Sequence, residues 1–459
     1  MTEFRVVERE ETPSLTLRGL QVLSAKESTD LFVISAETIS SMRDCPKCRV
    51  GGELIAFGRK EQEFRDMPVQ GKHVRIFVSR RRYRCKACGK TSLELLPWAH
   101  EERYATKRLV EAIERDALIS PNFHVAHRYG VDEKTIKNIL DAYITRLDAA
   151  VKFETPTWLG IGEVQIVGKS RALMTNIQLQ TLVEMLPDCN KTTIFAYLQS
   201  LETHKVKVVS MAMRRPYRDA VREVIPHAVV VVDKFHVISL ANSALESIRK
   251  GWRSGLDAKG RKSLKNDRSI LLKRRQDLTV VELGELDHWK RNFPDLIAAY
   301  NAKEMFFDMY DVTSAKLARI RYERWLNTIP LALREKGGPW YGLVDAMQNW
   351  EREIMAYFDH PVTNAYTTSM NRIIRDIDRG GRGYSFPALR AKTLHGQEFR
   401  KRKKLASVSS RSRGMTFYMA LGPGAGVVYL EFGADLHRVA DSLEEQAKQH
   451  EQSSGRTSR

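Results

Sequence analysis

The chain has 459 residues, of which 42% are hydrophobic and 29% charged, so two to four domains and a sizeable core are expected. Lysine and arginine outnumber aspartate and glutamate by 75 to 56, which gives a net charge of +19 and favours a polyanionic partner. The sequence offers no run of about 18 apolar residues and no basic-then-apolar leader, so we expect a cytoplasmic protein without a membrane partner.

The first hundred residues predict a β region that carries a metal site. Apolar residues at 31–34 indicate a small sheet, and 73–78 and 82–84 indicate the two strands of a hairpin. This hairpin would return the second of two Cys-x-x-Cys pairs to the first across a gap of 36 residues. The four cysteines of the two pairs are Cys45, Cys48, Cys85 and Cys88.

Each Cys-x-x-Cys pair has the spacing that lets two thiolates bind one tetrahedral zinc ion. Four thiolates close the coordination shell, so the zinc is expected to be structural and not catalytic. The alternatives are two unrelated reduced pairs or a redox-active dithiol. The fifth cysteine, Cys189, is expected to be a lone thiol, and no disulfide framework is indicated.

Residues 101–150 predict a helix-turn-helix DNA-binding domain. Apolar residues recur at helical spacing over 106–118, and 122–139 indicate a helix, a tight turn at Gly130 and a second helix capped by Asp132. An ordinary helical hairpin is the alternative. On the DNA-binding interpretation, the second helix would direct four residues toward phosphates and base edges in the major groove: Lys134, Thr135, Lys137 and Asn138.

Residues from about 155 to 240 alternate strand-like and helix-like stretches, an order that predicts an α/β fold. Strands are expected at 159–161, 172–174, 181–183, 205–209 and 228–232, and helices at 193–201 and 217–225.

Three short motifs carry a resemblance to a known family: 158–163 (WLGIGE), 208–213 (VVSMAM) and 363–371 (TNAYTTSMN). With 216–221 (PYRDAV) and 232–237 (VDKFHV), they make residues 40–400 resemble the ISL-three family of bacterial insertion-sequence transposases. The resemblance implies a ribonuclease-H-like core over 151–237 and 346–400, interrupted by an all-helical insertion at 238–345. The zinc region 1–100 and the helix-turn-helix would precede this core, and a basic linker and tail over 401–459 would follow it.

The resemblance also implies that the catalytic Asp, Asp and Glu belong at Gly162, Ala212 and Thr368. Active members use these acids to offset the charge of two divalent metals during DNA strand cleavage and joining. Glycine, alanine and threonine offer one hydroxyl in total, so no catalytic acid is intact. The neighbouring Glu163 should point to the opposite face of its strand.

Asp233, in the motif at 232–237, is the residual acid in the region of resemblance. It could be a displaced second acid, or it could form a hydrogen-bonded pair with His236 that fixes the junction between the core and the insertion.

These observations favour a sequence-specific DNA-binding derivative of a transposase that does not cleave DNA and acts as a regulator or an architectural protein. Its partners would be double-stranded terminal inverted repeats, or a host site derived from them, and a second copy of itself, with a nucleoid location. The alternative is an active DNA transposase that uses displaced acids and magnesium. A third interpretation is an RNA-binding zinc protein.

Overall fold

The computed structural model describes residues 5–7, 17–39, 42–49, 51, 54–264, 266–396 and 428–430. The chain is mixed α/β and divides into two compact units. The first unit contains residues 1–152, 380–428 and 435–459, and the second contains 153–379 and 429–434. The tail expected over 401–459 lies outside the described residues, apart from β15 (Val428–Leu430), which pairs with β9 (Val151–Phe153).

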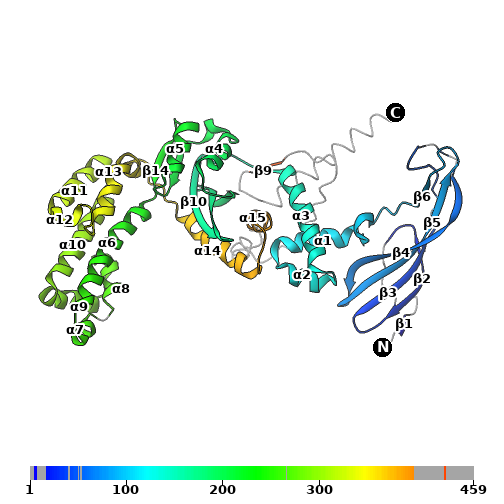
Figure 1. The fold of residues 1–459 in the computed structure, drawn as a ribbon, viewed down its shortest axis with the longest axis horizontal. Coiled ribbons are helices and arrows are strands. Elements are labelled where there is room, and N and C mark those ends of the chain that lie inside the picture. Colours follow the sequence, from blue (N-terminus) through cyan, green and yellow to red (C-terminus); the bar gives the residue numbers. More distant parts are fainter. Residues whose placement is uncertain are drawn as a thin grey trace, which may run out of the picture. The chain divides into compact units, whose positions relative to one another are not determined.

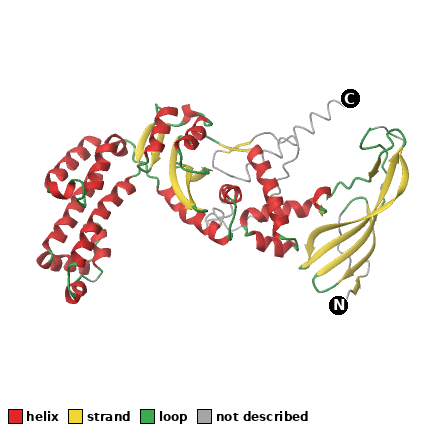
Figure 2. Ribbon diagram, in the orientation of Figure 1, coloured by secondary structure: helices red, strands yellow, loops and turns green. Residues whose placement is uncertain are grey.

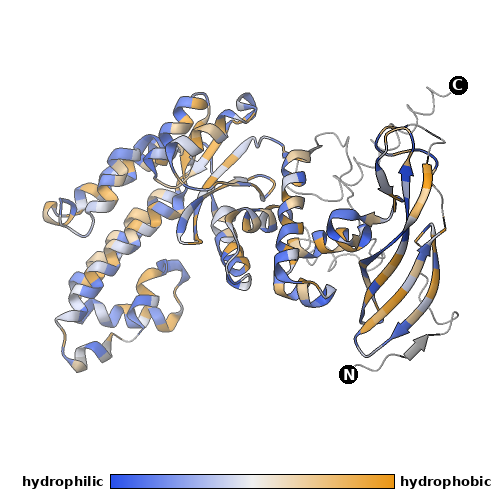
Figure 3. Cartoon of the chain, turned by 45° about the vertical axis from the view of Figure 1, so that its right-hand side comes forward, coloured by the Kyte–Doolittle hydropathy of each residue, from blue (hydrophilic) through white to orange (hydrophobic). Residues whose placement is uncertain are grey.

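An eight-stranded sheet dominates the first unit (Figure 1). Buried and half-buried residues alternate along β3, which confirms the strand expected at 31–34, and hydropathy alternates along the sheet (Figure 3). The order is β1-β2-β3-β5-β4-β8-β7, with β6 paired to β5. The strands are β1 (Arg5–Val7), β2 (Leu20–Glu27), β3 (Leu31–Thr38), β4 (Leu54–Val69), β5 (Lys72–Cys85), β6 (Thr91–Leu93), β7 (Ala99–His100) and β8 (Ala105–Thr106).

The hairpin expected from 73–78 and 82–84 is wrong in one respect. Both stretches belong to the single strand β5, and its hairpin partner is β4, which pairs with it along almost its whole length. In β4 the apolar residues gather toward the two ends and charged or polar residues fill 59–63, so periodicity alone did not reveal it. The second cysteine pair still returns to the first, because Cys85 at the end of β5 faces Leu54 at the start of β4.

Four helices complete the first unit: α1 (Lys107–Ile119), α2 (Asn122–Tyr129), α3 (Glu133–Ala150) and α15 (Phe386–His395). The helices expected on either side of Gly130 are therefore present. Helix α15 lies in the segment that was assigned to the last part of the core, yet it packs on α1 and α3. Its Lys392 ammonium is buried and donates to the carbonyls of Ala117 and Ser120 at the end of α1.

The second unit is built on a five-stranded sheet of order β12-β11-β10-β13-β14. The first three strands form the antiparallel meander that the sequence predicts, and β13 and β14 run parallel to β10. The strands are β10 (Trp158–Ile166), β11 (Lys169–Asn176), β12 (Thr181–Met185), β13 (Val208–Met211) and β14 (Val229–Val232).

Alternation along β10 assigns its two faces to different helices. Leu159 and Ile161 join the apolar core beneath α4 (Lys191–Gln199) and α5 (Arg215–Val224). Gly160 and Gly162 face the other way, toward α14 (Ala365–Gly380). Figure 1 shows α4 and α5 on one side of β10 and α14 on the other.

The segment between the two parts of the sheet unit is helical, as expected for the insertion (Figure 2). Its helices are α6 (Lys234–Ser254), α7 (Ala258–Ser263), α8 (Asp267–Leu272), α9 (Val280–Asn292), α10 (Pro294–Phe307), α11 (Ala315–Thr328), α12 (Leu331–Arg334) and α13 (Tyr341–Met355). Short 3-10 turns occur at η1 (Glu101–Arg103), η2 (Thr203–Lys205), η3 (Arg275–Asp277), η4 (Asp308–Asp311) and η5 (Ala356–Phe358). Of the helices described, none combines the length and apolar character needed to cross a membrane.

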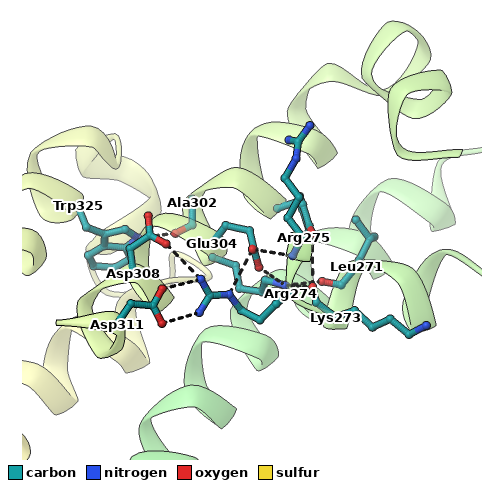
Figure 4. Close-up of polar contacts among 11 residues, drawn as sticks. Leu271, Lys273, Arg274, Arg275, Ala302, Glu304, Asp308, Asp311 and Trp325 are labelled. Carbon is teal, nitrogen blue, oxygen red and sulfur yellow. Dashed lines mark hydrogen bonds and ion pairs between the residues drawn. The ribbon is translucent and has the colours of Figure 1, made fainter. Parts of the chain in front are cut away.

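A polar centre holds the middle of this insertion together (Figure 4). The guanidinium of Arg274 bonds Glu304 of α10 at 3.3 Å, Asp308 at 3.2 Å and Asp311 at 2.9 Å. The neighbouring Lys303 ammonium is fully buried and donates to the carbonyls of residues 271 and 273 at 2.9 and 2.6 Å. A buried cation is tolerated there because it is paired and hydrogen-bonded.

Candidate metal centre and nucleic-acid interface

The four cysteines converge at the end of the β4–β5 hairpin. Their sulfur atoms all lie within 4.8 Å of one another, with 3.8 Å between those of Cys45 and Cys88 and 3.6 Å between those of Cys48 and Cys85. A tetrahedral zinc ion with Zn–S bonds of about 2.3 Å needs sulfur separations of about 3.8 Å. The geometry therefore fits one structural zinc ion with a closed shell of thiolates.

The two cysteine pairs have the same local construction. Each forms a turn in which the amide four residues after the first cysteine donates to the carbonyl of that cysteine, at 2.8 Å for Arg49 and 2.9 Å for Gly89. Both closing residues have positive φ. The amides of Cys48 and Lys47 donate to the Cys45 sulfur and lower its pKa to about 6. The thiolate, which is the form that binds zinc, is thereby favoured.

A left-handed residue joins α2 to α3. Gly130 has φ of +63° and its amide donates to the Ala126 carbonyl, which ends α2. A Cβ at this position would lie 2.7 Å from the His73 ring, so both conformation and space require glycine. The Asp132 carboxylate then accepts the Thr135 amide at 2.8 Å and caps α3.

The four residues expected to contact DNA lie on the first two turns of α3, and they differ in exposure and in their side-chain partners. Lys134 and Asn138 are exposed, and no ion pair restrains Lys134 within the described chain. Lys137 is exposed but pairs with Asp141 at 2.8 Å. Thr135 is half-buried and its hydroxyl donates to Asp132 at 2.7 Å, so its first role is in the cap.

Four arginines follow one another closely on β5, at 80, 81, 82 and 84, and Arg80 is buried and cannot contact a ligand. Its guanidinium is 2% exposed and bonds both carboxylate oxygens of Glu101 at 2.9 Å. Arg82 and Arg84 are instead accessible and lie 5.4 and 6.0 Å from the Phe57 ring centroid. Phe57 was missed in the sequence, because one exposed aromatic residue in a strand of mixed composition gives no periodic signal.

The resemblance implies acids at three positions that lie on β10, directly after β13 and on α14, and this region of the five-stranded sheet is named the acid-free edge. Ile161 of β10 is in register with Met211 of β13, and Gly162 and Ala212 follow them. Helix α14 carries the third position, Thr368, but the α14 residue that contacts Gly162 is its neighbour Thr367. Thr368 is exposed and donates to the Asn364 carbonyl at 3.3 Å.

The space that an acid would need at Gly162 is occupied. A Cβ built there would lie 2.3 Å from the Thr367 methyl carbon. Thr367 is buried and held by a 2.6 Å hydrogen bond to the Thr175 hydroxyl, and the Asn364 amide donates to the Ile161 carbonyl at 3.0 Å. Helix α14 is therefore seated directly on the glycine backbone of β10.

Two other acids near this edge, Glu163 and Glu353, form ion pairs with arginines. Glu163 forms an ion pair with Arg214, on the opposite face from Gly162, as the strand alternation predicts. Glu353 is buried and paired with Arg222. Within the described chain, the four cysteines are the sole group of three or more His, Cys, Asp or Glu side chains whose donor atoms converge on a point. The residues present at the edge do not fit a two-magnesium site.

Asp233 lies beside this edge, but it is buried. Its amide donates to the Met211 carbonyl at 3.0 Å, and one carboxylate oxygen accepts the Phe235 amide at 3.4 Å, which caps α6. Burial raises the pKa of this carboxyl. Asp233 and His236 are hydrogen-bonded through the backbone, since the His236 amide donates to the Asp233 carbonyl at 3.0 Å; the Asp233 carboxylate caps α6 and the His236 side chain is exposed.

Comparison with known proteins relates the cysteine region and the five-stranded sheet to one family. A family model of DDE transposases of the ISL3 group matches residues 159–393, and a model of the zinc-finger of transposases IS204, IS1001, IS1096 and IS1165 matches residues 43–88. The chain is 24% identical over 337 residues to the transposase for insertion sequence element IS1001 of Bordetella parapertussis, covering 70% of this chain and 80% of that protein. It is 22% identical over 388 residues to the transposase for insertion sequence element IS1557 of Mycobacterium tuberculosis, covering 77% and 86%.

Proposed function

Because the chain belongs to the DDE transposases of the ISL3 group, we propose that it is a DNA-binding member of this family that does not cleave DNA. The single observation that carries the proposal is the packing of Thr367 against Gly162, which occupies the space where a first catalytic acid would project. An acid lost by one recent substitution would leave a hole at this edge. The occupied space instead supports a protein whose packing has adapted to the absence of this acid and which does not cleave DNA.

On this proposal the five-stranded sheet is a ribonuclease-H-like core whose three acid positions are Gly162, Ala212 and Thr368. The strand order and the parallel pairing of β10, β13 and β14 support that assignment. Two metal ions bound during phosphoryl transfer bring four positive charges, which one threonine hydroxyl cannot offset. No cleavage step is therefore assigned to these residues.

DNA binding is proposed for the first unit. Helices α2 and α3 would act as a helix-turn-helix in which Lys134, Lys137 and Asn138 face the major groove and Thr135 positions the helix start. The net charge of +19 supports a polyanionic partner. The targets would be terminal inverted repeats or a derived host site, bound by a homo-oligomer at the nucleoid as a regulator or an architectural protein.

The test is to incubate the zinc-loaded protein with fragmented genomic DNA and magnesium, and to sequence both bound fragments and new strand ends. Enrichment at discrete sites without new ends is the expected result. New ends at inverted repeats would overturn the proposal in favour of an active transposase with displaced acids.

An active transposase is the second candidate, and Asp233 is the observation that favours it. This carboxyl lies next to Met211, and one of its oxygens has no hydrogen-bond partner within the described residues. If wild-type protein produces new strand ends, Asp233→Asn should abolish them while duplex affinity is kept. If the protein only binds, Asp233→Asn should leave affinity unchanged.

A further inference from the structure

The end of the β4–β5 hairpin next to the cysteines differs from the rest of the sheet. This ribbon end comprises residues 54–61 and 79–85. All residues from 55 to 61 are exposed, whereas Phe64 further along β4 is fully buried in the core of the sheet. Since strand side chains alternate between faces, exposure of seven successive residues means that both faces of β4 are open here.

Positively charged residues predominate at the ribbon end. Its sequence carries six arginine and lysine residues against one acid, Glu61. Arg80 and Arg59 are neutralised by Glu101 and Glu37. The other four cations form no ion pair with a carboxylate within the described residues, and these are Lys60, Arg81, Arg82 and Arg84.

An exposed aromatic ring lies among these cations. Phe57 is 46% exposed, and the guanidinium carbons of Arg82 and Arg84 lie 5.4 and 6.0 Å from its ring centroid. A guanidinium that contacts a ring through its face keeps its in-plane N–H groups free to donate. The ring therefore holds both arginines in place without using the donors that a phosphate needs.

The backbone fixes Phe57 in this position. The register between β4 and β5 shifts between Ala56 and Arg59, and Gly58 within the shift has φ of +82°. Such a bulge redirects side chains at one point of a ribbon. The cysteine cluster anchors the open end, since Leu54 pairs with Cys85, so little conformational freedom remains to be lost on binding.

We infer that the ribbon end is a second DNA-binding element, separate from α3, that takes duplex DNA. Arg82 and Arg84 contact phosphates, and Phe57 makes an apolar contact with the bases between them. A two-stranded ribbon fits a major groove, and an exposed phenylalanine can contact a thymine methyl group or wedge between base steps. This inference rests on the proposed DNA-binding function and adds a site to it.

The test measures binding of the full-length zinc-loaded protein to a fluorescein-labelled 40-base-pair random duplex, by anisotropy over a series of salt concentrations. Each phosphate contact contributes about 0.9 to the slope of log affinity against log salt. R82A/R84A should therefore lower the slope by about 1.8. F57A should weaken binding about tenfold with little change in slope, because its contact is apolar.

Arg75→Ala is the matched control, because this exposed arginine lies on the same strand but pairs with Glu63. It should leave slope and affinity unchanged. Zinc content and circular dichroism identify any variant that fails to fold. In that case R84A alone, at an exposed position, should still lower the slope by about 0.9.

An unchanged slope for R82A/R84A, or an unchanged affinity for F57A, would overturn the inference. So would a preference for single-stranded RNA of equal length in competition. The proposed function is tested separately by K134A/K137A on α3. If that variant weakens binding while the ribbon variants do not, the ribbon site fails and the DNA-binding proposal stands; if wild type does not bind the duplex, the proposal itself fails.

Discussion

The cysteine cluster and the acid-free edge of the sheet lie in different units, and they differ in how side chains pack around them. In the first, four side chains converge with sulfur separations of 3.6 and 3.8 Å, which leaves a central space that fits a metal ion. In the second, no group of three or more acidic side chains converges among the described residues, and Thr367 lies where a side chain at Gly162 would project. The cysteine cluster is thus a set of donors around a space, whereas the space beside Gly162 is filled by a neighbouring side chain.

The largest effect should come from breaking the first cluster. C85S/C88S should lose zinc and weaken duplex binding at least about 100-fold, because structural zinc supplies folding free energy to small metal-bound domains. Metal analysis and anisotropy measure both effects. Cys189→Ser is the control, since this half-buried thiol lies outside the cluster. Full duplex affinity in a zinc-free C85S/C88S protein would show that the cluster does not support binding.

An acid introduced at Gly162 of the acid-free edge should destabilise the protein. Gly162→Asp should lower the free energy of unfolding by about 2–4 kcal/mol, because its Cβ meets the Thr367 methyl carbon at 2.3 Å. Chemical denaturation measures the change, and T367A should recover part of it. Gly342→Asp is the matched control, since a Cβ there meets nothing within 4 Å. Equal stability of the two aspartate variants would contradict the closed edge.

Acid should affect the first unit through His395. This histidine is buried, and burial lowers its pKa to about 4 from an ordinary value of 6.5. The unfolded chain binds the proton first, so stability is present above pH 6.5 and is lost as pH falls toward 4. The loss should reach about 3 kcal/mol and be smaller in His395→Gln.

Thermal unfolding between pH 7 and 4.5 measures the effect of acid. The exposed His204→Gln should behave as wild type. An unaltered pH dependence in His395→Gln would rule out this histidine as the cause.

The smallest effects should separate the cations of α3. Lys134→Ala should weaken duplex binding about fivefold and lower the salt slope by about 0.9, the value for one phosphate contact. Lys137→Ala should do less, because Lys137 already pairs with Asp141. Salt titrations of the two variants provide the comparison. A larger loss for Lys137→Ala would reverse the assigned roles.

Local patterns predicted much of the fold. The meander, the helices on either side of Gly130 and the two cysteine pairs were predicted from periodicity, turn residues and spacing, which act over a few residues. Strand β4 was missed because its charged residues obscure its period. Helix α15 was assigned to the core because nothing in its own sequence says that it packs on α1 and α3.

The sequence by itself determined which chemical groups the protein has: four thiolates at zinc spacing, a cationic excess, and no acid at Gly162, Ala212 or Thr368. Tertiary structure decided which of those groups are available. It buried Arg80 against Glu101, left Arg82 and Arg84 beside an exposed Phe57, and placed Thr367 over Gly162. The physical reason is that residue identity sets charge and donor type, while burial and ion pairing depend on segments far apart in the chain.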